Sequence, residues 1–159
     1  MTEMSVHIDI QVESDLWGSV ERWEPLANHT VVAVCDRLGI SRSDSELSIL
    51  MTHDAVIQHL NEQWRDIDKP TNVLSFPAVP GGRKGVLPPL IGDIVLAFET
   101  VNREAQLEGK SLEHHVMHLI VHGFLHLLGY DHENDLEALD METLEIKILA
   151  DLNVDDPYR

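Results

Sequence analysis

The sequence predicts an α/β fold of the mixed α+β kind, with a small mixed four-stranded sheet packed against about five helices. Three observations lead to this expectation. The length of 159 residues fits a single domain, residues 1–159, with one hydrophobic core. Short strand-like segments alternate with segments of helical period in the order β-α-β-α-β-β-α-α-α. No internal repeat or interdomain linker interrupts this order.

Four segments have the composition of β-strands. The first alternates polar and apolar residues with period two, as half-buried strands do, and the third ends at Pro77. Residues 79–89 are rich in glycine and proline, which predicts an exposed loop between the third and fourth strands. The expected strands are 7–12, 46–51, 71–76 and 91–97.

Five segments show the spacing of helices. The fourth is apolar almost all round, which indicates a central helix buried on most faces. This helix also carries the candidate metal ligands His122 and His126. Ser111 is its expected N-cap, and Gly129 supplies the left-handed residue after its end. The expected helices are 19–38, 52 or 53 to 64, 99–107, 112–128 and 134–152. The buried side of the last helix is expected to hold Leu136, Leu139, Leu144, Ile148 and Leu152, with its acids on the opposite side.

The chain is strongly acidic, with 28 acids, 11 bases and a net charge of −17. That balance argues against a protein that grips nucleic acid over a broad surface, because such affinity comes mainly from phosphate neutralisation. The charge is uneven, however: residues 78–92 contain no acid and include Arg83 and Lys84. A local basic surface on an acidic body and a merely solubilising acidic surface both remain open.

Composition also bears on the compartment. No apolar run approaches the roughly 20 residues that a membrane-spanning helix needs, and the N-terminal residues 1–4 lack the features of a secretion signal. The single cysteine, Cys35, cannot form an internal disulfide and is expected to be a buried small hydrophobe rather than a reactive thiol. We therefore expect a cytoplasmic protein that does not associate with membranes.

The chain holds ten histidines, and their spacing matters more than their number. His118, His122 and His126 recur every four residues and form one stripe on the central helix. His122 and His126 can place two ring nitrogens on one metal ion, and His132 follows the turn at Gly129 as a third ligand. Three neutral nitrogens leave a fourth tetrahedral position open, which is typical of catalytic zinc sites. Zinc is the leading cofactor, with copper, iron and nickel as alternatives.

The remaining histidines have simpler interpretations. A lone histidine in a helix is usually packed or solvated, whereas a polar stripe on an apolar helix needs partners. His118 is one turn before His122, so it could support a ligand or carry a proton. His114 and His115 are expected to be exposed at the helix start. Surface or packing roles are expected for His7, His29, His53 and His59.

Gly123 bears on the reaction. Metalloproteases with the same histidine spacing carry a glutamate general base directly after the first histidine, and here that position is Gly123. Peptide hydrolysis by that mechanism therefore lacks its base. Zinc can still lower the pKa of a bound water to about 7, and an arginine is well shaped to stabilise charge on a phosphoryl oxygen. These properties favour phosphodiester hydrolysis.

Two long motifs and one short one carry a resemblance. Residues 118–132, residues 60–77 and residues 92–94 together resemble the YbeY family of bacterial endoribonucleases and rRNA-maturation factors. The resemblance implies that the three zinc ligands are His122, His126 and His132, and that Arg65 is the catalytic arginine. It also implies metal-dependent cleavage of single-stranded RNA in small-subunit rRNA 3′-end maturation and ribosome quality control. The expected partners are the ribosome or small-subunit ribosomal proteins, with no DNA substrate.

These expectations combine into a mechanistic hypothesis. Arg65 contacts a phosphoryl oxygen, with a structural ion pair to Asp66 or Asp68 as the alternative. His118 is a second catalytic candidate. Asp93 and Asp131 could orient ligand histidines or serve as caps or turn residues. The expected guides for the RNA backbone are Lys69, Arg83 and Lys84.

Two rival functions remain. One is a ribosome-assembly factor whose zinc is structural and which has little nuclease activity of its own. The other is a metallohydrolase that acts on peptides or small phosphoesters instead of RNA.

Overall fold

The structure, a computed structural model, describes residues 6–40, 44–79 and 87–158. Arg83 and Lys84 therefore lie outside the described residues. The strands are β1 (Val6–Val12), β2 (Ser45–Thr52), β3 (Val73–Pro77) and β4 (Leu90–Ala97). The α-helices are α1 (Val20–Leu38), α2 (Asp54–Arg65), α3 (Phe98–Glu108), α4 (Leu112–Leu127) and α5 (Asp135–Asp151). A short 3-10 helix, η1 (Asp15–Trp17), was not predicted.

The four strands form one mixed sheet in the order β1-β2-β4-β3. β1 pairs with β2 and β2 with β4 in parallel, while β3 runs antiparallel to β4 at the edge. The predicted α/β fold with a mixed four-stranded sheet and five α-helices is confirmed. Each predicted strand and helix is found, with its ends displaced by at most two residues.

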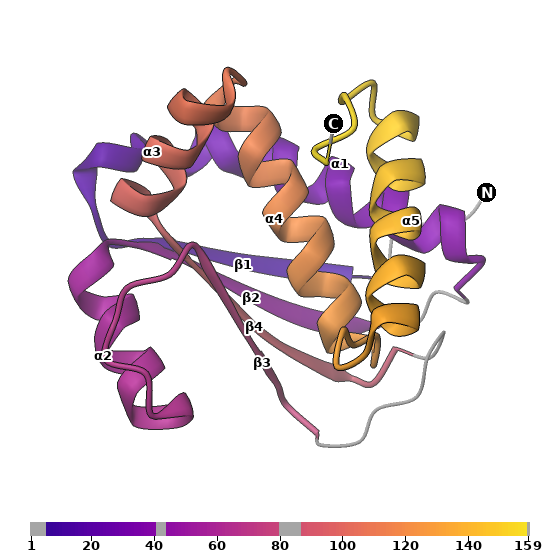
Figure 1. The fold of residues 1–159 in the computed structure, drawn as a ribbon, viewed down its shortest axis with the longest axis horizontal. Coiled ribbons are helices and arrows are strands. Elements are labelled where there is room, and N and C mark those ends of the chain that lie inside the picture. Colours follow the sequence, from indigo (N-terminus) through magenta and orange to yellow (C-terminus); the bar gives the residue numbers. More distant parts are fainter. Residues whose placement is uncertain (1–5, 41–43, 80–86, 159) are drawn as a thin grey trace.

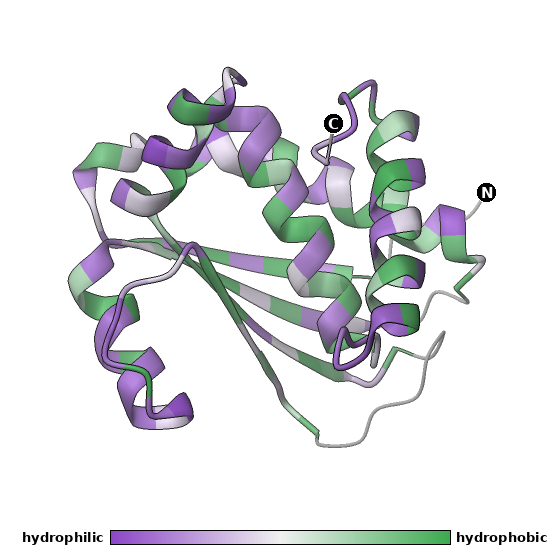
Figure 2. Cartoon of the chain, in the orientation of Figure 1, coloured by the Kyte–Doolittle hydropathy of each residue, from purple (hydrophilic) through white to green (hydrophobic). Residues whose placement is uncertain are grey.

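The helices lie on both faces of the sheet (Figure 1). α1, α3, α4 and α5 cover one face, and α2 packs on the other. Alternation along β4 divides the core accordingly, because Ile94 and Leu96 join the main cluster whereas Val95 and Ala97 pack with Ile57 of α2. Figure 2 shows hydrophobic residues along the strands and on α4, where hydrophilic positions interrupt them.

α4 is the central helix that the sequence predicts, and most of its residues are buried. Ser111 caps its start by accepting a hydrogen bond from the His114 amide at 3.1 Å. At its end, the Gly129 amide donates to the His126 carbonyl and the Tyr130 amide donates to the Leu125 carbonyl, each at 3.0 Å. This is the Schellman arrangement, with Gly129 at a positive φ of 100°. It turns the chain back toward α4 and brings His132 near the helix.

The prediction for the buried side of α5 is partly wrong. Leu136 and Leu139 are 69% and 60% exposed, although both were expected in the core. The buried stripe instead begins at Met141 and continues through Glu145 to Ile148. Ile148 and Leu152 are buried and Leu144 is partly buried, as expected. Leu136 and Leu139 are exposed because they lie in the first turns of α5, before the stripe that packs on the core begins.

Two smaller expectations concern composition. Cys35 is 1% exposed, which confirms that it is buried. No helix among residues 6–40, 44–79 and 87–158 combines the length and the apolar character that a bilayer crossing requires.

Gly92 should tolerate substitution poorly. Its φ is +144°, and a Cβ atom there would lie 2.3 Å from the backbone oxygen of Phe76 on the paired strand. We expect Gly92→Ala to lower the free energy of unfolding by roughly 2–4 kcal/mol, from strain and overpacking together. Urea denaturation of the purified variant measures this loss.

Gly109→Ala is the matched control. Gly109 also has a positive φ, +67°, but a Cβ atom added there would meet nothing within 4 Å. Backbone strain alone should cost roughly 1–2 kcal/mol there. Equal destabilisation by the two substitutions would contradict the close approach between β3 and β4.

Candidate metal centre

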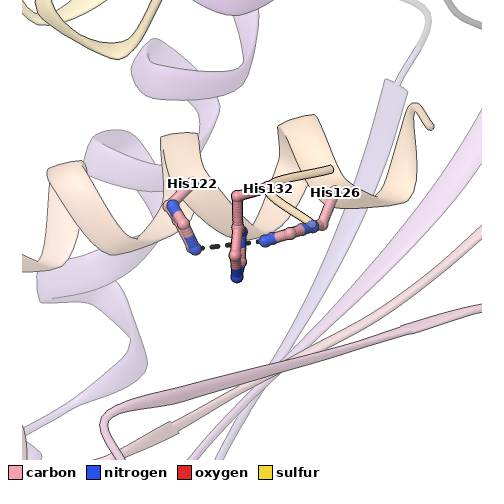
Figure 3. A group of neighbouring side chains, drawn as sticks. All are labelled: His122, His126 and His132. Atoms are coloured by element: carbon pink, nitrogen blue, oxygen red, sulfur yellow. Dashed lines mark hydrogen bonds between the residues drawn. The ribbon is translucent and has the colours of Figure 1, made fainter. Parts of the chain in front are cut away.

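Three histidines converge beside the C-terminal half of α4. His122 and His126 come from the helix, and His132 comes from the turn that precedes α5. Each offers a ring nitrogen, and the three nitrogens lie within 4.8 Å of one another. Figure 3 shows the three side chains drawn together, with a dashed line between the ring nitrogens of His122 and His126. The structure thus brings together the three residues that the sequence singles out as metal ligands.

In His122 and His126, the hydrogen bonds made by Nδ1 determine that Nε2 is the nitrogen available to bind a metal ion. Nδ1 of His122 lies 2.7 Å from a carboxylate oxygen of Glu145, and Nδ1 of His126 lies 3.1 Å from the carbonyl oxygen of Tyr130. Both partners accept hydrogen bonds, so both Nδ1 atoms carry the proton in the neutral rings. The two Nε2 atoms therefore direct lone pairs toward each other across 3.2 Å.

This arrangement fits a metal ion. Two lone pairs at that distance repel unless a cation lies between them. In a tetrahedral zinc site, with bonds of about 2.0–2.1 Å, neighbouring ligand nitrogens lie about 3.3 Å apart. The observed 3.2 Å agrees with that spacing. Burial, followed by the charges of His122 and His132, lowers the pKa of His126 to about 4, so its ring is neutral at pH 7, as a ligand must be.

Glu145 is the main site residue that the sequence analysis missed. Its side chain is completely buried and accepts hydrogen bonds from His118 Nε2 at 2.9 Å, His122 Nδ1 at 2.7 Å and the hydroxyl of Tyr158. Burial raises its pKa, but the hydrogen bonds from the two histidines outweigh that effect and lower the pKa to about 2. An ionised carboxylate therefore fixes His122 from behind, as supporting carboxylates do in many metal sites.

His118 stands behind this carboxylate and is not part of the metal cluster. Burial lowers the pKa of His118, so its ring is neutral at pH 7. Its Nε2–H group donates a hydrogen bond to the carboxylate of Glu145. Nε2 also lies 3.3 Å from the hydroxyl of Tyr158. This placement favours the interpretation that His118 supports a ligand through Glu145.

His115 corrects another expectation. His114 is exposed as predicted, but His115 is only 3% exposed. Its Nε2 lies 2.8 Å from Glu104, which also accepts a hydrogen bond from Asn72 at 3.0 Å. The expectation of exposure was wrong because α3 packs against the first turns of α4 and covers this position.

The histidines open onto a cleft of about 830 Å³ between α4, β3 and the end of α2. Arg65 lines this cleft; it is the last residue of α2 and is exposed. Among residues 6–40, 44–79 and 87–158, no ion pair joins Arg65 to Asp66 or Asp68, so the structural alternative for this arginine is not seen. Lys69 is exposed but lies outside the cleft lining.

Two aspartates were candidates for orienting ligands or shaping turns. Asp131 accepts a hydrogen bond from the backbone amide of His132 at 2.7 Å, so it shapes the turn rather than holding a ring. Asp93 points away from the site, because its neighbour Ile94 faces α4 and successive residues of a strand face opposite sides.

The close packing of α4 on β3 explains why position 123 is a glycine. Its carbonyl oxygen accepts a hydrogen bond from the Ser75 hydroxyl at 3.2 Å, so α4 lies directly on β3. A Cβ atom at Gly123 would lie 2.9 Å from that hydroxyl oxygen and 3.3 Å from Ile94. A side chain at this position would crowd Ser75 and Ile94, and the chain has no carboxylate where the proteolytic general base would be.

Comparison with known proteins identifies the family of this chain. The sequence matches the family described as Endoribonuclease YbeY over residues 8–153. The chain belongs to the YbeY family. It is 50% identical over 153 residues to "Endoribonuclease YbeY" of Methylocella silvestris, covering 96% of this chain and 85% of that protein. It is 48% identical over 153 residues to the protein of the same name from a Bradyrhizobium strain, covering 94% and 90%.

One solved structure has a similar fold. The solution structure of TM1509 from Thermotoga maritima superposes with a TM-score of 0.58 at 20% identity, covering 96% of both chains. The fold is therefore shared at low identity.

Glu145→Gln should weaken metal binding. A glutamine cannot accept hydrogen bonds from both His118 and His122 with its two terminal atoms, because one of these atoms is a donor. We expect the zinc dissociation constant to rise roughly 10- to 100-fold, as for other supporting residues. Competition with a chromophoric chelator measures it.

Asp140→Asn is the matched control on the same helix, because Asp140 is exposed. It should leave zinc affinity unchanged. A Glu145→Gln protein that binds zinc as tightly as this control would show that the carboxylate does not support the site.

Proposed function

We propose that this chain is a zinc-dependent endoribonuclease that cuts single-stranded RNA in small-subunit rRNA 3′-end maturation and ribosome quality control. The observation that carries the proposal is the convergence of three histidine nitrogens in one open cleft, which is also lined by an arginine without an ion-pair partner among the described residues. The membership of the YbeY family supports RNA as the substrate. We place this activity in the cytoplasm.

Zinc is the proposed metal because the donor set consists of three imidazoles, two of which have the nitrogen spacing of a tetrahedral zinc site. His122, His126 and His132 would hold it. When bound, zinc with one open position supplies a nucleophilic water near neutral pH and polarises a phosphoryl oxygen. The chain itself orients the rings of His122 and His126 through Glu145 and the Tyr130 carbonyl, so that their Nε2 atoms face the site.

Arg65 is the proposed partner of the substrate phosphate. Its guanidinium is permanently charged, can bind two phosphoryl oxygens at once and has no ion-pair partner in the described part of the chain. Charge that develops on those oxygens during hydrolysis would be stabilised by it.

Lys69, Arg83 and Lys84 are the proposed guides for the RNA backbone, and His118 is proposed to act through Glu145. The rest of the chain is acidic, so these bases would define where RNA approaches. We propose the ribosome or small-subunit ribosomal proteins as partners, and no DNA substrate.

A ribosome-assembly factor with a structural zinc is the second candidate. Structural zinc sites usually have four protein ligands, and the cluster in residues 6–40, 44–79 and 87–158 offers three. The open position therefore favours catalysis. Hydrolysis of peptides is disfavoured because Gly123 stands where the metalloprotease mechanism needs a glutamate base.

Arg65→Ala should separate catalysis from metal binding. We expect full zinc content and a loss of roughly 10²- to 10³-fold in kcat, the usual effect of removing one charge-stabilising group. His126→Ala should lose both zinc and activity. A defined single-stranded RNA and metal analysis of nuclease-free protein provide the measurements.

Arg103→Ala is the control, because Arg103 is an exposed arginine on α3 that does not line the cleft. It should cut at the wild-type rate. Wild-type activity in Arg65→Ala would remove the proposed role of that arginine, and an inactive zinc-loaded wild type would favour the assembly factor.

The double variant Arg83→Ala/Lys84→Ala should bind RNA less tightly and with weaker salt dependence. Each phosphate contact on a single strand contributes about 0.7 to the slope of log Kd against log salt. The slope, measured with a labelled single-stranded RNA, should therefore fall by up to about 1.4. Lys147→Ala on α5 should leave it unchanged, and an unaltered slope in the double variant would contradict the guiding role.

A further inference from the structure

The rim of the cleft carries an exposed aromatic residue that the catalytic scheme does not use. Trp64 is 66% exposed, whereas the other two tryptophans of the chain, Trp17 and Trp23, are 0% and 1% exposed. Trp64 precedes Arg65 at the end of α2 and lines the same cleft as the three histidines. The most exposed large hydrophobic residue among those described, Leu107, lies away from this cleft.

A second aromatic side chain supports this tryptophan. The ring centroid of Phe76 on β3 lies 6.2 Å from that of Trp64, with the planes inclined at 59°. Phe76 is half-buried and packs against the core cluster between α2 and the sheet. Phe76 thus contacts the Trp64 ring on the α2 side of the sheet, while much of the Trp64 ring remains open to solvent on the lining of the cleft.

The charge of the cleft shows why an aromatic surface would be needed. Binding of nucleic acid usually depends on many lysines and arginines that neutralise phosphates. Among the described residues that line this cleft, Arg65 is the one permanent cation, and Asp131 opposes it with a negative charge. The net charge of −17 adds no long-range attraction for RNA. A contact that does not depend on charge would therefore add affinity for a strand to what these few cations supply.

We propose that Trp64, backed by Phe76, is a platform on which one base of a single-stranded RNA stacks while a phosphodiester of the same strand reaches Arg65 and the histidines. This inference rests on the proposed function, since it takes RNA as the substrate. Every base has a π-face, so stacking tolerates any sequence. Bases within a duplex are already stacked on their neighbours, so the platform also selects single strands.

The fluorescence of Trp64 can test this contact directly. Trp64 is the exposed tryptophan, so a base that stacks on it should quench the solvent-exposed part of the fluorescence and leave Trp17 and Trp23 unaffected. The probe is a short 2′-O-methyl oligonucleotide, which resists cleavage. An oligonucleotide of the same length with abasic positions keeps the phosphates and should quench far less.

Variants then measure the contribution to binding. We expect Trp64→Ala to raise the Kd for the labelled oligonucleotide roughly 5- to 150-fold, the range found for loss of one stacked base. Trp64→Phe keeps an aromatic face and should stay much closer to the wild type. Leu107→Ala removes an exposed apolar side chain outside the cleft and should have no effect. Because Trp64 is exposed, circular dichroism and zinc content should be those of the wild type.

Measurements of KM and kcat distinguish the stacking role of Trp64 from the proposed nuclease activity. With cleavable RNA, Trp64→Ala should raise KM and leave kcat near the wild-type value, whereas Arg65→Ala should lower kcat. If the wild type cuts RNA but Trp64→Ala has an unchanged Kd and KM, the platform is overturned and the nuclease stands. Equal quenching by the abasic oligonucleotide also overturns it. An inactive wild type whose Trp64 is still quenched only by intact bases would support the platform and reject the nuclease.

Discussion

The carboxylate of Glu145 joins the two helices on which the candidate metal centre depends. It lies fully buried on α5 and accepts hydrogen bonds from two histidines of α4 and from Tyr158. A buried carboxylate is costly unless its hydrogen bonds are satisfied, and a nearby cation offsets its charge further. The packing of α5 on α4, the tautomer of His122 and the affinity for a metal ion are therefore parts of one electrostatic arrangement.

Much of the fold and the ligand set could be predicted because both depend on local spacing. Strands with period two and helices with period 3.6 follow from which faces are apolar, and their ends are marked by residues such as Gly39 and Gly129. His122 and His126 share a helix face wherever that helix lies. His132 follows a glycine-ended helix within three residues, so short-range geometry alone places it near them.

The supporting residues could not be predicted in the same way, because they depend on which helix faces which. Glu145 is one of many acids in α5, and only the packing against α4 distinguishes it from its exposed neighbours. A usable signal did exist: Met141, Glu145 and Ile148 have the spacing of a single buried stripe. His115 was misjudged for the same reason, since α3 covers it from a distant part of the sequence.

The hydrogen bonds behind the ligand rings also bear on which ion the site accepts. His122 and His126 are each anchored through Nδ1, so the 3.2 Å gap between their Nε2 atoms can widen only if those anchors stretch or break. A cation with a larger ionic radius needs longer bonds and a wider gap, and it would bind at the expense of the anchors. In a metal-bound protein, this rigidity on the outer side of the rings would discriminate between ions by size, in addition to the preference of imidazole for particular elements.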